Sequence, residues 1–427
     1  MSPISPISPM QTLTLDNGLR IVVDHRPGQV VYCGIAVAAG TRNQLDDEFG
    51  MAHFIEHMSF KGTRRRRAWH ILNRMESVGG DLNAYTGKEH TVYYCSCLRQ
   101  HLGRALDLLF DITLHSVYPQ NEIAKEREVV IDEIESYNDS SSELIYDDFE
   151  ALLFGDHPLG RNILGDAERL RQYQTADLRR FVDRLYHPSR MVLFVLGDVT
   201  MKTLVKVLSE ERRVKSEECK LHLSTCEQPA GNSDSSLFTL HSSLPSPMQV
   251  KKHTHQAHVI VGCPAYALGD DRYTGLCLLN NILGGPGMNS RLNLSLRERR
   301  GLVYTVESSL TGYTDTGVWT TYFGCDHSDV SRCLRLVHNE LDRLCGARLS
   351  DAALAAAKRQ LKGQVVLGWE NGENVAIGMG RRLLHLGQTQ TLDELCGEID
   401  GLTATQLLDI AQDVFAPERL VTLTYGP

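Results

Sequence analysis

Residues 185–197 read Leu185-Tyr-His-Pro-Ser-Arg-Met-Val-Leu-Phe-Val-Leu-Gly197, and residues 414–426 read Val414-Phe-Ala-Pro-Glu-Arg-Leu-Val-Thr-Leu-Thr-Tyr-Gly426. Pro188 pairs with Pro417 at a separation of 229 residues, and the arginine and the glycine of each stretch pair at the same separation. In both copies an amphipathic helical pattern runs into a turn at the proline, and an apolar strand pattern follows. The chain therefore contains the same helix–turn–strand unit twice.

A second match supports a duplication of the whole domain. Residues 85–97 align with residues 313–325 at a separation of 228, nearly the same offset as the first match. Two matches at one offset predict a duplicated domain of about 200 residues. A charged stretch that becomes rich in Ser, Asn, Gly and Pro separates the halves, as is typical of a linker. We therefore predict four parts: a disordered tail (1–10), a first half (11–208), a linker (209–236) and a second half (237–427).

Strand and helix patterns alternate within each half. This order predicts an α+β fold, in which two similar domains each pack helices on a largely antiparallel sheet. The elements expected in the first half are strands at Leu13–Val23, Val31–Ala39 and Thr91–Leu98, and helices at Ala68–Val78, Leu102–His115 and Glu122–Tyr137.

One short motif carries chemistry: His53-Phe54-Ile55-Glu56-His57. On a helix, His53 and His57 lie on one face one turn apart, a spacing that lets two imidazoles bind the same tetrahedral ion, most plausibly zinc. Glu56 lies close enough to take a proton from a water on that ion. The order H-x-x-E-H is the inverzincin signature. The alternative is a half-buried histidine pair without a metal, which this short motif alone does not exclude.

A third ligand is expected from the helix that follows Pro119. Glu126 and Glu133 are seven residues apart and share a helical face to within about 20°. They flank the apolar pair Val129 and Val130, where a carboxylate needs a counter-charge or a metal. The alternative is that these acids form ordinary ion pairs on the helix edge with Lys125 and Arg127. Spacing alone leaves both interpretations open.

Together, the His53–His57 motif and Glu133, 76 residues beyond it, resemble the pitrilysin/insulinase family of zinc peptidases. The length resembles the short-chain branch, which includes mitochondrial processing peptidase and bacterial relatives. Further stretches resemble the same family in the same order, and together they span most of the chain: Leu15–Val23, Ala38–Arg42, Leu82–Thr86 and Leu296–Tyr304.

The resemblance implies a role for each residue of the metal site. It implies that His53, His57 and Glu133 bind one Zn²⁺ per chain and that Glu56 is the general base. It implies that Glu126 orients a ligand histidine, as metal sites commonly require. Zinc lowers the pKa of a bound water to about 7, so hydrolysis at neutral pH is chemically consistent with these roles.

The resemblance also implies residues that contact the substrate. Asn83 and Ala84 resemble the strand edge that holds an extended peptide by β-augmentation. Arg297 and Tyr304 resemble the pair that stabilises the oxyanion of the scissile carbonyl. Considered alone, an arginine at a helix end and a tyrosine in a strand core would be the simpler interpretation of this pair.

Two further patterns differ from the expected chemistry. Gly284-Gly-Pro286-Gly departs from the uninterrupted glycine run of the family, and Pro286 is expected to stiffen this loop. No Lys-Ser/Thr follows these glycines, so they are not a phosphate-binding loop. The spacing of His253, His255 and His258 fits an exposed strand start better than a second metal site.

Composition excludes several classes of function. The 427 residues carry a net charge of −9 with a pI near 6.0, which argues against nucleic acid as the main partner. No apolar stretch reaches the ~18 residues of a membrane span, and the N-terminus does not resemble a secretory signal or a mitochondrial presequence. Eleven scattered cysteines fit free thiols in a reducing compartment, so we expect a cytoplasmic protein. The basic run Arg64–Arg67 is interpreted as a solvated loop, with contact to an acidic peptide as the alternative.

The sequence and this resemblance together predict a soluble zinc endopeptidase, and the resemblance implies a closed chamber that admits short or unfolded peptides. A homodimer is the simplest expectation, because this one chain carries both the zinc residues and the Arg–Tyr pair. The alternatives are a catalytic subunit that needs an unlike partner chain, and an inactive scaffold or binding relative. Whether Arg297 and Tyr304 act within their own chain or across the dimer is left open, as are the substrate and the cleavage preference.

Overall fold

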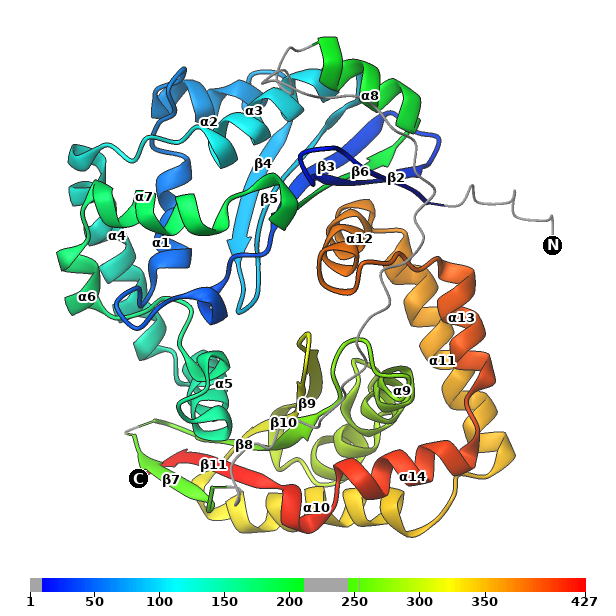
Figure 1. Cartoon of the computed structure of the whole chain (residues 1–427). Helices are drawn as coiled ribbons and strands as arrows, with labels where there is room; N and C mark the ends of the chain where they lie inside the picture. The colour runs from blue at the N-terminus through cyan, green and yellow to red at the C-terminus, as the bar shows by residue number, and fades with distance from the viewer. Residues whose placement is uncertain (1–9, 211–244, 253) are drawn as a thin grey trace. The chain divides into compact units, whose positions relative to one another are not determined.

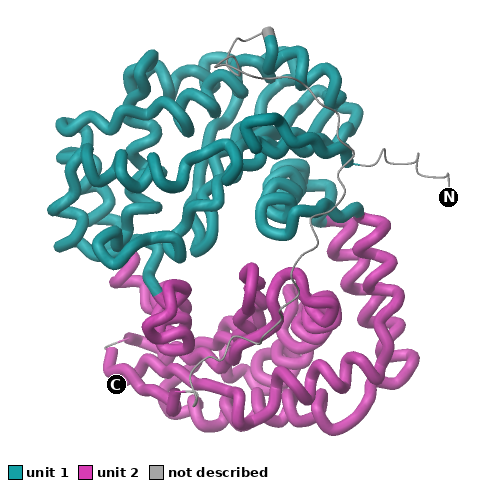
Figure 2. The backbone as a smooth tube through the Cα atoms, in the orientation of Figure 1, with its two compact units in different colours: residues 1–135, 161–231, 368–391 teal, residues 136–160, 232–367, 392–427 magenta. Residues whose placement is uncertain are grey.

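The structure is a computed structural model that describes residues 10–210, 245–252 and 254–427. Nearly all of the predicted tail, most of the predicted linker and His253 lie outside these residues. The described chain divides into two compact units, drawn in different colours in Figure 2. Of the described residues, the first unit holds 10–135, 161–210 and 368–391, and the second holds 136–160, 245–252, 254–367 and 392–427.

The first unit is built on a six-stranded sheet with the order β1-β2-β6-β3-β5-β4. All neighbouring strands are antiparallel except β2 and β6. The strands are β1 (Gln11–Thr14), β2 (Arg20–His25), β3 (Val30–Val37), β4 (Asp81–Thr86), β5 (Thr91–Leu98) and β6 (Met191–Gly197).

Helices cover both faces of this sheet. One face, which includes Ile35, Tyr93 and Val195, packs into the large core with most of the helices. The other face, which includes Ala36 and Phe194, packs against α12. The helices are α1 (Met51–Ser59), α2 (Ala68–Glu76), α3 (Leu102–Leu114), α4 (Gln120–Asp139), α6 (Ala167–Gln172), α7 (Thr175–Leu185), α8 (Met201–Glu210) and α12 (Gly372–Leu386).

The second unit repeats this design. Its five-stranded sheet has the order β7-β11-β8-β10-β9, with strands β7 (Met248–Lys251), β8 (Ala257–Ala265), β9 (Val303–Gly312), β10 (Gly317–Cys325) and β11 (Val421–Gly426). Again one pair, β7 and β11, is parallel. The helices are α5 (Ser141–Phe154), α9 (Tyr273–Gly284), α10 (Val330–Gly346), α11 (Asp351–Trp369), α13 (Leu392–Gly401) and α14 (Ala404–Val414) (Figure 1).

The two units confirm the predicted α+β duplication. Strand β2 corresponds to β7, β6 to β11, β3 to β8, β5 to β10 and β4 to β9, so the two strand orders are the same apart from the additional β1. Helices α7 and α14 begin 229 residues apart, at Thr175 and Ala404, and each precedes a short helical turn at the proline and then a strand. The duplicated stretches therefore occupy equivalent places in the two sheets.

The units exchange one equivalent helix, which the sequence did not predict. Helix α5 follows the strands of the first half along the chain, yet Phe149 on α5 packs with Ile260 and Tyr425 of the second sheet. Helix α12 occupies the equivalent position in the second half, yet Met379 on α12 packs with Phe194 of the first sheet. Figure 2 shows residues 368–391 coloured with the first unit. The predicted halves follow the repeat along the sequence, whereas the compact units are not contiguous.

One predicted strand is wrong in its extent. The structure divides Leu13–Val23 into the hairpin strands β1 and β2, which pair in antiparallel register. The turn contains Gly18 at φ +85°, a left-handed conformation that favours glycine. The side chain of Asn17 accepts a hydrogen bond from the backbone N–H of Leu19 at 3.1 Å and supports this turn. The apolar pattern on both sides of the turn conceals the reversal of the chain.

Candidate metal centre

Helix α1 carries both histidines of the motif and is held in place by its packing in the core of the first unit. Phe54, Ile55 and Met58 are fully buried, so the apolar side of α1 is fixed in the core. His53 and His57 lie one turn apart with their ring centroids 4.6 Å from each other. His53 is 7% exposed, and the side chain of His57 is 22% exposed. The two imidazole rings therefore lie at the edge of the core, where little of either ring is exposed to solvent.

Helix α4 brings Glu133 to these two rings. Its Oε2 atom lies 3.8 Å from His53 Nε2 and 3.5 Å from His57 Nε2. One ligand atom from each of the three residues lies within 4.8 Å of the others, and this is the one such group found among the described residues. Val130 is buried on the same helix, but Val129 is 52% exposed, so only one valine of the predicted apolar pair reaches the core.

Glu126 holds the other nitrogen of His57. The distance from His57 Nδ1 to Glu126 Oε1 is 2.9 Å. Because a carboxylate accepts, Nδ1 donates and the lone pair of Nε2 is directed elsewhere. Lys61 forms an ion pair with the other oxygen of Glu126 at 2.5 Å. Burial alone would raise the pKa of Glu126, but the hydrogen bonds from His57 and Lys61 outweigh it and lower the pKa.

The protonation of the two histidines differs because their surroundings differ. Burial, with a smaller effect of His57, lowers the pKa of His53 to about 3, so His53 is neutral at pH 7. Burial also acts to lower the pKa of His57, but the hydrogen bond to Glu126 and the surrounding carboxylates raise it overall. The Nδ1 atom of His53 is buried and has no hydrogen-bond partner among the described residues. Two imidazoles and a carboxylate form a donor set that suits Zn²⁺.

Glu56 lies beside this group and contacts Thr86. The hydroxyl of Thr86 donates a hydrogen bond to Glu56 Oε2 at 2.6 Å. Burial raises the pKa of the Glu56 carboxyl, and this hydrogen bond partly offsets the increase. The sequence prediction assigned no role to Thr86 or Lys61. Both residues stood close to the motifs, since Thr86 ends the quoted stretch Leu82–Thr86 and Lys61 follows His57 by four residues, just beyond the end of α1.

Strand β4 carries Asn83 and Ala84 at the edge of the first sheet. It pairs with β5 alone in the described chain, so its other edge has no strand partner. Asn83 is exposed, and its amide donates to Asp81 at 2.9 Å. Ala84 packs partly against the core that contains α1. The geometry leaves a free edge on the strand whose last residue contacts Glu56.

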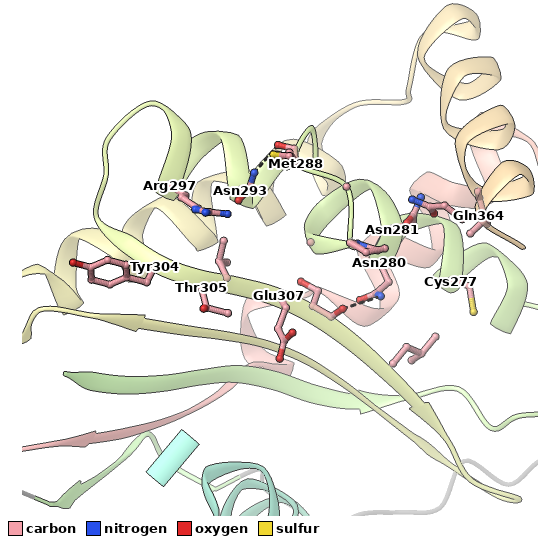
Figure 3. A pocket seen from close by; sticks show the side chains of 18 residues that line it. Cys277, Asn280, Asn281, Met288, Asn293, Arg297, Tyr304, Thr305, Glu307 and Gln364 are labelled. Carbon is pink, nitrogen blue, oxygen red and sulfur yellow. Dashed lines mark hydrogen bonds between the residues drawn. The ribbon is translucent and has the colours of Figure 1, made fainter. Parts of the chain in front are cut away.

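Arg297 and Tyr304 belong to the second unit, whereas the His–His–Glu group belongs to the first. Both residues line one cavity of about 590 Å³, Arg297 from a helical segment (Asn293–Glu298) and Tyr304 from β9 (Figure 3). Tyr304 is 79% exposed, so it does not fit the simpler interpretation of a tyrosine in a strand core. Gly284, Gly285 and Pro286 line the same cavity.

Two other sequence motifs acquire a structural explanation. His258 Nδ1 contacts the hydroxyl of Tyr322 at 2.9 Å at the start of β8, and no metal-binding group of the described residues includes it. The basic run is not simply a solvated loop, because Arg66 forms ion pairs with the buried carboxylates of Asp107 and Asp111. Arg64 and Arg67 are exposed.

Comparisons with known proteins match both halves of the chain. Residues 20–167 match the family described as insulinase (peptidase family M16), and residues 173–361 match the peptidase M16 inactive domain. His53, His57, Glu126 and Glu133 all lie in the first match. Among the described residues, no helix combines the length and the apolar character that crossing a bilayer requires.

Relatives cover nearly the whole chain. An uncharacterized zinc protease of Bacillus subtilis is 32% identical over 96% of this chain and 97% of its own length. The β subunit of the mitochondrial processing peptidase of Neurospora crassa is 30% identical over 94% of this chain and 84% of its own length. The crystal structure of a protease from Helicobacter pylori has the same fold, with a TM-score of 0.86 at 20% identity over 98% of this chain and 99% of that protease.

Proposed function

This chain belongs to the insulinase family, peptidase family M16, and on that premise we propose that it is a zinc-dependent endopeptidase. The observation that carries the proposal is the convergence of His53, His57 and Glu133, whose ligand atoms lie within 4.8 Å of one another. These residues would hold one zinc ion per chain. Relatives named zinc proteases support the choice of metal.

The residues around this group supply the remaining chemistry. When bound, zinc would contribute Lewis acidity, which activates water and polarises a peptide carbonyl. Glu56 would accept the proton of the attacking water and deliver it to the leaving amine. Thr86 would keep the Glu56 carboxylate in position, and Glu126 would keep His57 in the tautomer that offers Nε2.

The substrate would bind as an added strand. The free edge of β4 can form backbone hydrogen bonds with an extended peptide, and Asn83 and Ala84 lie on that strand. We assign the stabilisation of the oxyanion to Arg297 and Tyr304, which line one cavity of the second unit. The assignment holds whether Arg297 and Tyr304 act on a peptide bound by their own chain or on a peptide bound by a second chain. We assign to Pro286 the stiffening of the loop beside this pair.

The test separates binding of the metal from catalysis. Glu56→Gln should retain about one zinc per chain and lose peptide hydrolysis, because an amide cannot accept the proton. His57→Ala and Glu133→Ala should lose the metal as well. Zinc content by atomic absorption and cleavage of a mixed peptide library, with and without chelator, measure both properties. A Glu56→Gln protein that binds zinc and cleaves at the wild-type rate would contradict the assignment of the general base.

The assembly has two candidate forms. We propose a homodimer that encloses short or unfolded peptides in a chamber, because one chain carries both sets of residues. The relative named as the β subunit of a processing peptidase supports the second form, a catalytic subunit with an unlike partner. The inactive scaffold is disfavoured, because all three ligand residues and Glu56 are present. Light scattering on the purified chain, combined with the peptide digest, distinguishes these forms, and an inert monomer would contradict the homodimer.

We also propose a cytoplasmic location. The nine cysteines of the described chain are all free, and each is buried or half-buried. Free thiols in these positions suit a reducing compartment. Fractionation of the source cells with an antibody to this chain tests the proposal.

A further inference from the structure

A second cavity in the second unit, called the hollow below, is lined by more positive than negative side chains. It has a volume of about 490 Å³ and lies where three segments meet: the helical residues 291–299, the end of α10 and the start of α11. Four arginines line it together with a single carboxylate. The arginines are Arg291, Arg299, Arg343 and Arg348, and the carboxylate is Glu340.

The single carboxylate already has a partner. Glu340 is 6% exposed, and its Oε1 atom accepts a hydrogen bond from Arg343 Nη1 at 2.6 Å. In the part of the chain that the structure describes, no carboxylate forms an ion pair with Arg291, Arg299 or Arg348. Arg348 donates only a long hydrogen bond of 3.4 Å to the hydroxyl of Thr405. Glu340 also attracts Arg291 across the hollow, so among the described residues Arg299 and Arg348 face it without a carboxylate partner.

Simple structural roles account for only part of this cluster. Arg343 lies in the last turn of α10, where a positive charge is stabilised by the carbonyl end of the helix. That role does not explain Arg291, which is half-buried on another segment and whose pKa is lowered by burial. It does not explain Arg299 either, which reaches the same hollow from the end of the 291–299 segment. Guanidinium groups brought together repel one another unless an anion lies between them.

We propose that this hollow binds a small phosphate-bearing anion with several negative charges. The planar guanidinium group forms paired hydrogen bonds with phosphate oxygens, and Arg clusters are a common means of recognising phosphate. The volume lies within the range of small-molecule sites, about 300–1,000 Å³. Glu340 acts as a positioning residue that fixes Arg343. The site uses none of the residues assigned to peptide hydrolysis.

The test is an isothermal titration of the full chain with pyrophosphate at constant ionic strength. We expect saturable binding of one pyrophosphate per chain, and at least tenfold weaker binding of inorganic phosphate, which carries less charge. Citrate, a polycarboxylate, should also bind at least tenfold more weakly than pyrophosphate. Absence of saturable binding up to about 1 mM, near the weak end of specific affinities, would overturn the proposal. Equal binding of citrate would overturn the preference for phosphate.

Variants locate the binding. The double variant Arg299→Ala/Arg348→Ala should bind pyrophosphate at least tenfold more weakly, and because both arginines are exposed its thermal unfolding should match the wild type. Arg335→Ala is the matched control, since Arg335 is exposed on α10 but does not line the hollow. Its binding should be unchanged.

A further control excludes chelation. Pyrophosphate binds zinc, so the titration is repeated with His57→Ala, in which the proposed metal site is removed. If His57→Ala still binds pyrophosphate, the result supports binding in the hollow and excludes binding to zinc. Loss of binding in His57→Ala, or full binding in the double variant, would show that pyrophosphate binds elsewhere. Because the readout is binding and not hydrolysis, failure of the peptidase proposal leaves this test intact.

Discussion

At the scale of single residues, His57 has a defined proton position because of its neighbours. Glu126 accepts the hydrogen bond from Nδ1, and Lys61 holds Glu126 from its other side. The lone pair of Nε2 is then directed away from Glu126, and Nε2 lies 3.5 Å from Glu133 Oε2. A ligand held in one tautomer loses less freedom when it binds a metal, and such supporting residues commonly contribute 10- to 100-fold in affinity or activity.

This support predicts the effect of Glu126→Gln. The amide keeps the size of the side chain but loses the negative charge that favours the Nδ1 proton and pairs with Lys61. We expect zinc affinity to fall by about 10- to 100-fold, measured by competition with a chromophoric chelator. Glu128→Gln, an exposed position on the same helix, is the control and should leave affinity unchanged. Equal affinities of both variants would argue that Glu126 does not support the site.

At the scale of elements, α1 depends on a close contact between two backbones. Gly50 caps the helix at φ +77°, and a Cβ atom there would lie 2.7 Å from the carbonyl oxygen of Leu164. The next residue, Gly165, is also at positive φ, and a Cβ atom on it would lie 2.4 Å from the Cα atom of Gly50. The first turn of α1, which contains His53, is therefore positioned by contact between two glycines that leaves no room for a side chain.

Gly50→Ala should accordingly displace α1. We expect a loss of about 1–3 kcal/mol in the free energy of unfolding, from backbone strain and the clash together, and weaker zinc binding. Gly79→Ala is a matched control, because Gly79 has φ +71° but nothing lies within 4 Å of its Cβ position. It should cost only about 1 kcal/mol and leave zinc affinity unchanged. Urea unfolding and the chelator assay measure both effects.

The sequence predicted some elements well for identifiable reasons. Strand Thr91–Leu98 was correct because it is a short run of β-branched, aromatic and other apolar residues. The helix around Glu126 and Glu133 was correct in type because its apolar stripe is regular. The choice between ion pairs and a metal ligand for Glu133 could not be made from spacing. The proposal of a metal ligand rests on His53 and His57, whose ring nitrogens come close to Glu133 only in the folded chain.

The sequence could not predict which of the two sheets α5 and α12 each cover. Both helices carry apolar side chains, Phe149 on one and Met379 on the other, that fit the open face of a sheet. The duplication produced two sheets of the same strand order, so an apolar stripe does not specify which sheet it covers. Only the folded chain shows the exchange.

At the scale of the whole molecule, α12 joins distant parts of the chain through a histidine pair in which His90 is buried and His385 is half-buried. His385 Nε2 contacts His90 Nδ1 at 3.0 Å in the first unit. Burial, together with Arg381, lowers the pKa of His90 well below its ordinary value, and burial also lowers the pKa of His385. When both rings are neutral, one of these two nitrogens can donate a hydrogen bond and the other can accept it. When both rings are protonated, both nitrogens carry a proton and neither can accept.

This pair predicts a pH dependence of stability. Because the folded pKa values are lower than the unfolded value near 6.5, the unfolded state binds more protons below that pH. Stability should be fully present above about pH 6.5 and fall by up to about 1.4 kcal/mol per pH unit for each histidine below it. Urea unfolding at pH 7.5 and 5.5 measures the fall. His385→Gln should make it smaller, and an unchanged fall would contradict the role of this pair.

The exchange of helices also predicts how fragments behave. Residues 1–208 contain all six strands of the first sheet but lack α12, so Val22, Val192 and Phe194 would lose their cover. Each exposed apolar side chain costs about 1.5–3 kcal/mol, against a total stability of about 5–15 kcal/mol for a domain. We expect this fragment to aggregate when expressed alone, as measured by light scattering. Joining residues 368–391 to it through a flexible linker should restore solubility, and a soluble monomer without them would contradict the expectation.

The same exchange of helices determines when the first unit can complete its folding during translation. Strand β6, the last strand of the first sheet, ends at Gly197, yet α12 begins only at Gly372. Throughout the synthesis of the intervening chain, one apolar face of the nascent sheet has no partner. This protein should therefore be a client of chaperones that bind nascent chains, and translation that slows after Gly197 should lengthen its dependence on them.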